Sequence, residues 1–163
     1  MERSRRNAKD IDADSVRSKR LTIVGPDGSA RIELGTSNGG DAVLRMRDAN
    51  GTVRSVLSVQ EDSPRLRLLD AHGKIRLSAV LRDGEPGLEL LDGAGRARMV
   101  LFLRGHDNDV PDLYFLDADG RPRFGISLDA AGQVKMEAQS RLGELREPLW
   151  FQREGAVEDE PLD

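Results

Sequence analysis

Apolar and polar residues alternate along most of the chain between Leu21 and Ala138. The stretch Leu44–Val59 is an example. Leu44 and Met46 before a predicted turn, and Leu57 and Val59 after it, are spaced two residues apart and are expected on the same face. A period of two is typical of half-buried β-strands. Turn signals every 11 or 12 residues divide the region into strands of about seven residues. The pattern therefore predicts a β-meander of roughly ten to twelve strands.

The same region is a tandem repeat, marked by the tetrapeptide Asp-x-x-Gly. Regular copies occur at 48–51, 70–73, 92–95 and 117–120, an imperfect copy at 25–28, and a copy that is out of step at 129–132. An arginine follows three residues after each regular glycine, and the consensus is Pro-x-Leu-x-Leu-Leu-Asp-x-x-Gly-x-x-Arg. Repeats of about 22 to 25 residues indicate one supersecondary unit per copy.

Each Asp-x-x-Gly copy is expected to form a β-hairpin. Aspartate at the first position and glycine at the fourth are typical of a type I turn. If aspartate pairs with glycine across a two-residue loop, the first residues after the turn share a face with the preceding leucines. That register gives each copy one apolar face and places on it Val53, Ile75, Ala97 and Pro122.

Composition divides the chain into four segments. Residues 1–20 hold seven Lys or Arg against four Asp or Glu and are interpreted as a basic flexible arm. Residues 21–140 are the tandem β-hairpin repeat domain. Residues 141–153 are a capping or docking segment, in which Trp150 and Phe151 are candidates for partner docking. Residues 154–163 hold five acids and no base and are interpreted as an acidic tail.

The fold class predicted is all-β, and the apolar face must be covered. Self-association as a β-prism or a solenoid-like rod, and closure of one chain as a barrel or a sandwich, remain alternatives. A propeller is disfavoured, because about twelve strands make only three blades of four. Regular copies with little aromatic bulk favour the self-associating forms.

The repeated Leu-Leu-Asp-x-x-Gly-x-x-Arg units, entered by the segment Asp14–Leu21, resemble the tandem β-hairpin repeats of a group of uncharacterised bacterial proteins. The resemblance covers residues 14 to 138. It implies a hairpin architecture and supplies no catalytic residue, because the motif describes a turn and a strand pair.

Composition limits the function classes. Charged residues make up 33% of the chain and hydrophobic ones 37%, so the core is thin. The absence of cysteine excludes disulfides, thiol nucleophiles and cysteine-ligated zinc. Apolar runs are too short for a membrane span, and basic Met1–Arg6 is not followed by the apolar stretch of a signal peptide. We expect a cytoplasmic protein.

The clearest candidate site is a column of arginines that the repeat aligns: Arg31, Arg54, Arg76, Arg98 and Arg123. A ladder of guanidinium groups is suited to a polyanion or a partner face. The alternative is that each arginine covers apolar neighbours and pairs with nearby acids. Net charge of −4 and 4% aromatic residues argue against nucleic acid as the partner.

Other residues offer little chemistry. His72 lies in a predicted turn, and the two histidines are too few for a metal site or a triad. The loop 105–111 contains Asp107, Asn108 and Asp109 without the spacing of a calcium loop. We expect no cofactor, no metal and no enzymatic activity.

The sequence therefore predicts a non-enzymatic structural or assembly protein, either a homo-oligomeric β-repeat module or an accessory subunit with protein partners. The alternative is a binding module for an apolar ligand in a barrel lumen or for a polyanion on the arginine face. A further hypothesis is a contact between the basic arm of one subunit and the acidic tail of another.

Overall fold

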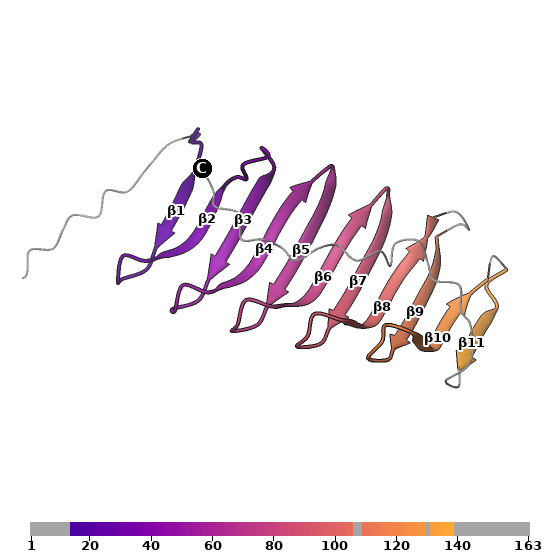
Figure 1. Cartoon of the computed structure of the whole chain (residues 1–163). Helices are drawn as coiled ribbons and strands as arrows, with labels where there is room; N and C mark the ends of the chain where they lie inside the picture. Colours follow the sequence, from indigo (N-terminus) through magenta and orange to yellow (C-terminus); the bar gives the residue numbers. More distant parts are fainter. Residues whose placement is uncertain (1–13, 106–108, 130, 139–163) are drawn as a thin grey trace, which may run out of the picture.

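The computed structural model describes residues 14–105, 109–129 and 131–138, which form one antiparallel sheet of 11 strands. Each strand pairs with its neighbours in sequence, so the sheet is a continuous meander. Figure 1 shows the strands side by side in one twisted layer. The strands are β1 Leu21–Val24, β2 Ala30–Thr36, β3 Ala42–Arg47, β4 Val53–Gln60, β5 Ser63–Leu69, β6 Ile75–Arg82, β7 Glu85–Leu91, β8 Ala97–Arg104, β9 Val110–Leu116, β10 Pro122–Leu128 and β11 Val134–Ala138.

The predicted all-β meander is confirmed, and its extent from Leu21 to Ala138 agrees with the alternation in the sequence. The alternatives in which one chain closes on itself as a barrel or a sandwich are wrong. β1 and β11 are the two edges of an open sheet and do not pair with each other. Closure within the chain would need those edges to meet or the sheet to fold onto itself, and Figure 1 shows neither.

The Asp-x-x-Gly turns lie along one long edge of the sheet, which we call the turn edge (Figure 1). In the turn after β3, the Gly51 N–H donates to the Asp48 carbonyl at 3.1 Å, and the Asp48 N–H donates to the Thr52 carbonyl at 3.0 Å. Gly51 has φ +83°. The loop therefore holds three residues, a type I turn followed by a left-handed glycine, rather than the predicted two.

The extra loop residue corrects the predicted faces. Val53 pairs with Arg47, and Ser55 pairs with Met46, so Arg54 is the additional residue of a β-bulge. Val53 consequently lies on the face opposite Met46, while the strand from Ser55 onward has the predicted orientation. The same register shift moves three more residues to the opposite face: Ile75, Ala97 and Pro122.

The long side of the sheet opposite the turn edge carries shorter turns between β4 and β5 and between β6 and β7. Glu61 and Asp62 have φ of 48° and 60°, and Asp83 and Gly84 have φ of 51° and 86°. Two successive left-handed residues define a type I′ turn, whose twist matches that of the flanking strands. The two edges thus differ in loop chemistry, and the repeat of about 22 residues contains one turn of each kind.

Gly95→Ala is expected to lower the free energy of unfolding by about 1–2 kcal/mol, because Gly95 has φ +77° and alanine is strained in the left-handed region. Gly93→Ala in the same turn is the matched control. A methyl group at either position meets open space, but only Gly95 has a positive φ. Urea denaturation of both variants tests this, and an equal loss of stability would contradict the assignment of the turn.

Candidate functional site

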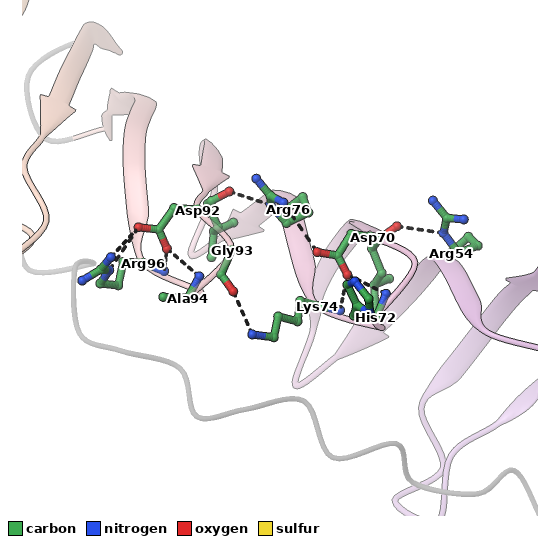
Figure 2. Close-up of polar contacts among 11 residues, drawn as sticks. Arg54, Asp70, His72, Lys74, Arg76, Asp92, Gly93, Ala94 and Arg96 are labelled. Carbon is green, nitrogen blue, oxygen red and sulfur yellow. Dashed lines mark hydrogen bonds and ion pairs between the residues drawn. The ribbon is translucent and has the colours of Figure 1, made fainter.

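At the turn edge, one carboxylate organises each turn. The Asp70 Oδ1 accepts hydrogen bonds from the backbone N–H of His72 at 2.9 Å and of Lys74 at 3.1 Å. Oδ2 of the same residue faces Arg76 at 3.5 Å. Figure 2 shows this arrangement beside the corresponding group around Asp92. The aspartate therefore fixes the loop with one oxygen and leaves the other to pair with a cation.

The five arginines of the predicted column all occupy the bulge position that follows a turn. Each pairs with the aspartate of its own turn, and those ion pairs are Arg31–Asp27, Arg54–Asp48, Arg76–Asp70, Arg98–Asp92 and Arg123–Asp117. The structure thus brings these residues together along one edge, with a carboxylate beside every guanidinium group. The sequence analysis gave pairing with nearby acids as the alternative role of this column, and the acids are the turn aspartates.

Three arginines of the column also connect one hairpin to the next. The Arg54 Nε donates to the Leu69 carbonyl at 3.0 Å, and the Arg76 Nε donates to the Leu91 carbonyl at 2.9 Å (Figure 2). Arg31 donates in the same way to the Asp48 carbonyl at 2.6 Å. Each accepting residue lies at the beginning of the following turn. Hydrogen bonds from a charged donor are stronger than neutral ones, so the arginine ladder ties consecutive hairpins together.

The turn carboxylates have lowered pKa values. For Asp70 the largest cause is the hydrogen bond from the His72 N–H, which together with the bonds from Lys74 and Arg76 outweighs the opposing effect of desolvation. The pKa values of Asp92, Asp117 and Asp129 are also lowered, and the largest cause in each case is the backbone N–H four residues later. Hydrogen bonds that need the ionised form favour it.

The second feature is the face of the sheet that carries the leucines, which we call the apolar face. One row crosses all eleven strands through directly paired residues: Leu21, Leu34, Leu44, Leu57, Leu66, Ala79, Leu88, Leu101, Leu113, Ile126 and Met136. The adjacent row is Ile23, Ile32, Met46, Ser55, Leu68, Leu77, Leu90, Met99, Phe115, Phe124 and Ala138. Neither row contains a charged residue.

Side chains of the apolar face are open to solvent. Leu57 is 49% exposed, Leu101 40% and Phe115 41%. Phe115 and Phe124 touch each other with ring centroids 5.9 Å apart. Exposed apolar patches of this continuity are characteristic of interaction surfaces.

The opposite face, which we call the charged face, carries the most deeply buried side chains of the described residues. Its central row is Glu33, Arg45, Val56, Arg67, Ser78, Glu89, Val100, Tyr114, Gly125 and Glu137. Val100 is 0% exposed and Arg67 is 7% exposed. Val100, Phe102 and Leu116 form a buried cluster with Ala97 and Tyr114 packed against it.

Burial also affects the polar groups of the charged face. The Asp112 carboxylate is 1% exposed and pairs with Arg104. Burial raises the pKa of the Tyr114 phenol, and the neighbouring carboxylates of Asp112 and Glu137 act in the same direction. Alternation along β3 and β5 already places Arg45, Arg65 and Arg67 on the face opposite the leucines. It assigns a side chain to a face and does not predict that the side chain is buried there.

The remaining sequence candidates are placed as follows. Trp150 and Phe151 lie outside the described residues, as do Asp107 and Asn108. His72 is an exposed turn residue. Among residues 14–105, 109–129 and 131–138, no group of three or more histidine, aspartate or glutamate side chains is arranged to hold a metal ion.

Comparison with known proteins gives no family. No family model matches the chain, and no curated protein matches it. A crystal structure of an S. aureus TarM mutant in complex with fondaparinux, α-GlcNAc-glycerol and UDP is similar over 74% of this chain, with 13% identity and a TM-score of 0.31. The match spans only 20% of the TarM chain. In the described part of the protein, no helix is long and apolar enough to cross a membrane.

The lowered pKa values predict acid sensitivity. Because the folded pKa of Asp70 lies below its ordinary value of 3.8, the unfolded chain binds more protons as the pH falls. The stability that the turn carboxylates contribute is therefore complete above about pH 5 and is lost as the pH falls through their folded pKa values. Urea midpoints should decrease between about pH 5 and pH 3.

Asp70→Asn should reduce that decrease, because the amide keeps an acceptor oxygen but cannot titrate. Asp62→Asn, in a turn at the other edge, is the control and should leave the decrease unchanged. A urea midpoint that is constant down to about pH 3 would contradict the role assigned to the turn carboxylates.

Proposed function

We propose that the protein is a non-enzymatic assembly protein whose subunits associate through their apolar faces. The observation that supports this proposal is the apolar face itself: an uncharged surface that crosses eleven strands and stays open in the single chain. A sheet with one apolar face needs a second layer to remove that face from water. The described residues form only one layer, so the second layer is expected to come from another chain.

The apolar face is large enough for a stable interface. With neighbouring strands about 4.8 Å apart, eleven strands span about 48 Å. Strands of about seven residues extend about 24 Å at 3.4 Å per residue, giving a face of about 1,100 Å². Stable interfaces bury about 800 Å² on each partner, so the face exceeds the usual requirement.

A second copy of this chain is the partner that fits the apolar face best. The rows of leucines repeat with the spacing of the strands in one direction and of alternate residues in the other. A copy presents the same grid, so side chains of the two inner faces can interdigitate as in other packed sheets. Homo-oligomers with closed symmetry are also the usual form of assembly.

The two edge strands, β1 and β11, favour association through the faces of the sheet over the addition of further strands. β1 has only four residues, and β11 has five, with Lys135 and Glu137 on it. Short strands with charged side chains discourage edge-to-edge pairing. Growth by adding strands to the sheet is therefore disfavoured relative to burial of the apolar face.

The alternative functions have less support. An apolar ligand in a barrel lumen needs a closed sheet, and this sheet is open. A polyanion on the arginine column would have to compete with a turn aspartate beside each guanidinium group. Those ion pairs favour a structural role for the column.

We expect light scattering after size exclusion to give the mass of a discrete oligomer for the full chain. Leu57→Glu and Leu101→Glu should each reduce that mass to a monomer, because a charge would be buried at the interface. Both side chains are exposed in the single chain, so neither variant should lose its β-sheet circular dichroism. Val16→Glu is the control, since Val16 is exposed and precedes the sheet.

Two results would overturn the proposal. One is a wild-type protein that stays monomeric at high concentration. The other is an oligomer whose mass is unchanged in both leucine variants, which would place the interface elsewhere.

A further inference from the structure

The two long sides of the sheet (Figure 1) expose different charges. At the turn edge, the carboxylates are less exposed than the arginines that pair with them. The Asp70 side chain is 22% exposed and the Arg76 side chain 46%, and the pairs at Asp48 and Asp92 show the same difference. The hydrogen bonds from the loop N–H groups account for it, because they hold each carboxylate against the backbone. The turn edge thus presents guanidinium groups to the solvent.

Three turns of the turn edge carry a second cation, directly after the turn glycine. These residues are Lys74, Arg96 and Arg121, and all three are exposed. The structure describes all five turns of this edge, and the exposed acids in them are Asp27 and Asp119. Cations therefore predominate on the exposed surface of the turn edge.

The opposite long side, which we call the acidic edge, has the reverse composition. Its described loop residues contain no base and six acids, which are Asp41, Glu61, Asp62, Asp83, Asp109 and Asp129. All except the first and the last of these are exposed. The bases at the ends of the adjoining strands have acids beside them, because Arg82 lies opposite Glu85 and Arg104 forms an ion pair with Asp112. The exposed charge of this edge is therefore negative.

We propose that copies of the chain associate in a parallel arrangement, in which the turn edge of one copy lies beside the acidic edge of the next. The rows of strands from β1 to β11 then run in the same direction in every copy. The copies are related by rotation about an axis parallel to this row, and their apolar faces are turned towards that axis. This inference rests on the proposed association through the apolar faces and specifies its orientation.

Aligned sheets can also bury their apolar faces with the two rows of strands running in opposite directions. This opposed arrangement places each turn edge beside the turn edge of the partner, and each acidic edge beside the other acidic edge. Like charges then face each other along both sides of the assembly, which is unfavourable. Complementary charge sets orientation more than it adds affinity. The two edges therefore select the parallel arrangement, while burial of the apolar faces supplies the driving force.

The loops of the two edges alternate in level along the row of strands. Lys74 ends the turn between β5 and β6, whereas Asp62 lies between β4 and β5 and Asp83 between β6 and β7. Rotation about an axis parallel to the row leaves these levels unchanged. Lys74 of one copy is then about 4.8 Å along the axis from the level of each of these two acidic loops of the next copy. The same holds for Arg96 and Arg121, since the acidic loops on either side of each also carry an aspartate.

Cysteine cross-linking tests which edges meet, because the chain contains no cysteine. Ala118→Cys introduces a thiol on the turn edge, and Ala131→Cys introduces one on the acidic edge, at the opposite end of β10. Both alanines are exposed. β10 has seven residues and is about 24 Å long, so a short bismaleimide joins the two thiols only between copies. In the parallel arrangement the two loops lie one strand apart in level.

We expect the double variant to form cross-linked oligomers severalfold faster than either single variant. Ala71→Cys, in the turn between β5 and β6, should cross-link little by itself, although a monofunctional maleimide should label it fully. The opposed arrangement reverses this result. It brings β5 of one copy opposite β7 of the other and so places the two 70–74 turns about 4.8 Å apart in level.

Charge reversal gives an independent test in the full chain. One triple variant changes the turn edge (Lys74→Glu, Arg96→Glu and Arg121→Glu), and another changes the acidic edge (Asp62→Lys, Asp83→Lys and Asp109→Lys). Each should raise the concentration at which the oligomer dissociates severalfold, and high salt should reduce this effect. Combining both sets in one chain should restore assembly, which general unfolding would not allow. The matched control is Arg17→Glu, Lys19→Glu and Arg20→Glu, exposed positions that precede the sheet, and it should leave assembly unchanged.

The results separate a wrong orientation from a wrong function. Rapid cross-linking of Ala71→Cys to itself, without preferential cross-linking of the double variant, would overturn the parallel arrangement and leave association through the apolar faces intact. A combined charge variant that assembles no better than either triple variant would do the same. A wild-type chain that stays monomeric would overturn both this inference and the proposed function on which it rests.

Discussion

A one-layer β-sheet has no interior, and this constraint governs the molecule. Each face of such a sheet must meet something other than the sheet itself to leave water. Here the two faces have different chemistry: one is lined by aliphatic rows without charge, and the other mixes arginines and acids with a small apolar cluster. The hydrophobic effect requires a cover for the first face, and the cost of burying charge requires a polar partner for the second.

The turn edge lets such a sheet exist without a core beneath it. Each aspartate closes its own loop through backbone N–H groups, and each bulge arginine joins that aspartate. The bonds from Arg31, Arg54 and Arg76 to the carbonyls of the next turn then link one hairpin to its neighbour. Local contacts of this kind are individually modest, but the bonds from the backbone N–H groups to the aspartate and its pair with the bulge arginine recur in every regular copy. Their repetition stabilises the turn edge along the length of the sheet.

The proposed assembly uses this separation of roles. The turn edge stabilises the subunit, and the apolar face is left for association with further copies. Because the arginine column is occupied by structural contacts, it needs no external ligand to account for its regularity. Arg45, Arg65 and Arg67 differ from this column, because they lie within strands rather than at bulges and are buried.

The amino-acid sequence alone determined the meander, the extent from Leu21 to Ala138 and the apolar face, because period-two alternation and Asp-x-x-Gly turns are local signals. It could not give the loop length, since a two-residue and a three-residue turn share the same tetrapeptide. Val53 and Ile75 were therefore assigned to the wrong face.

Only the tertiary structure decided that the sheet stays open and that Val100 and Arg67 are buried while Leu57 is not. Closure depends on the twist accumulated over eleven strands, and burial depends on contacts between residues far apart in the chain, and neither is encoded in a local pattern.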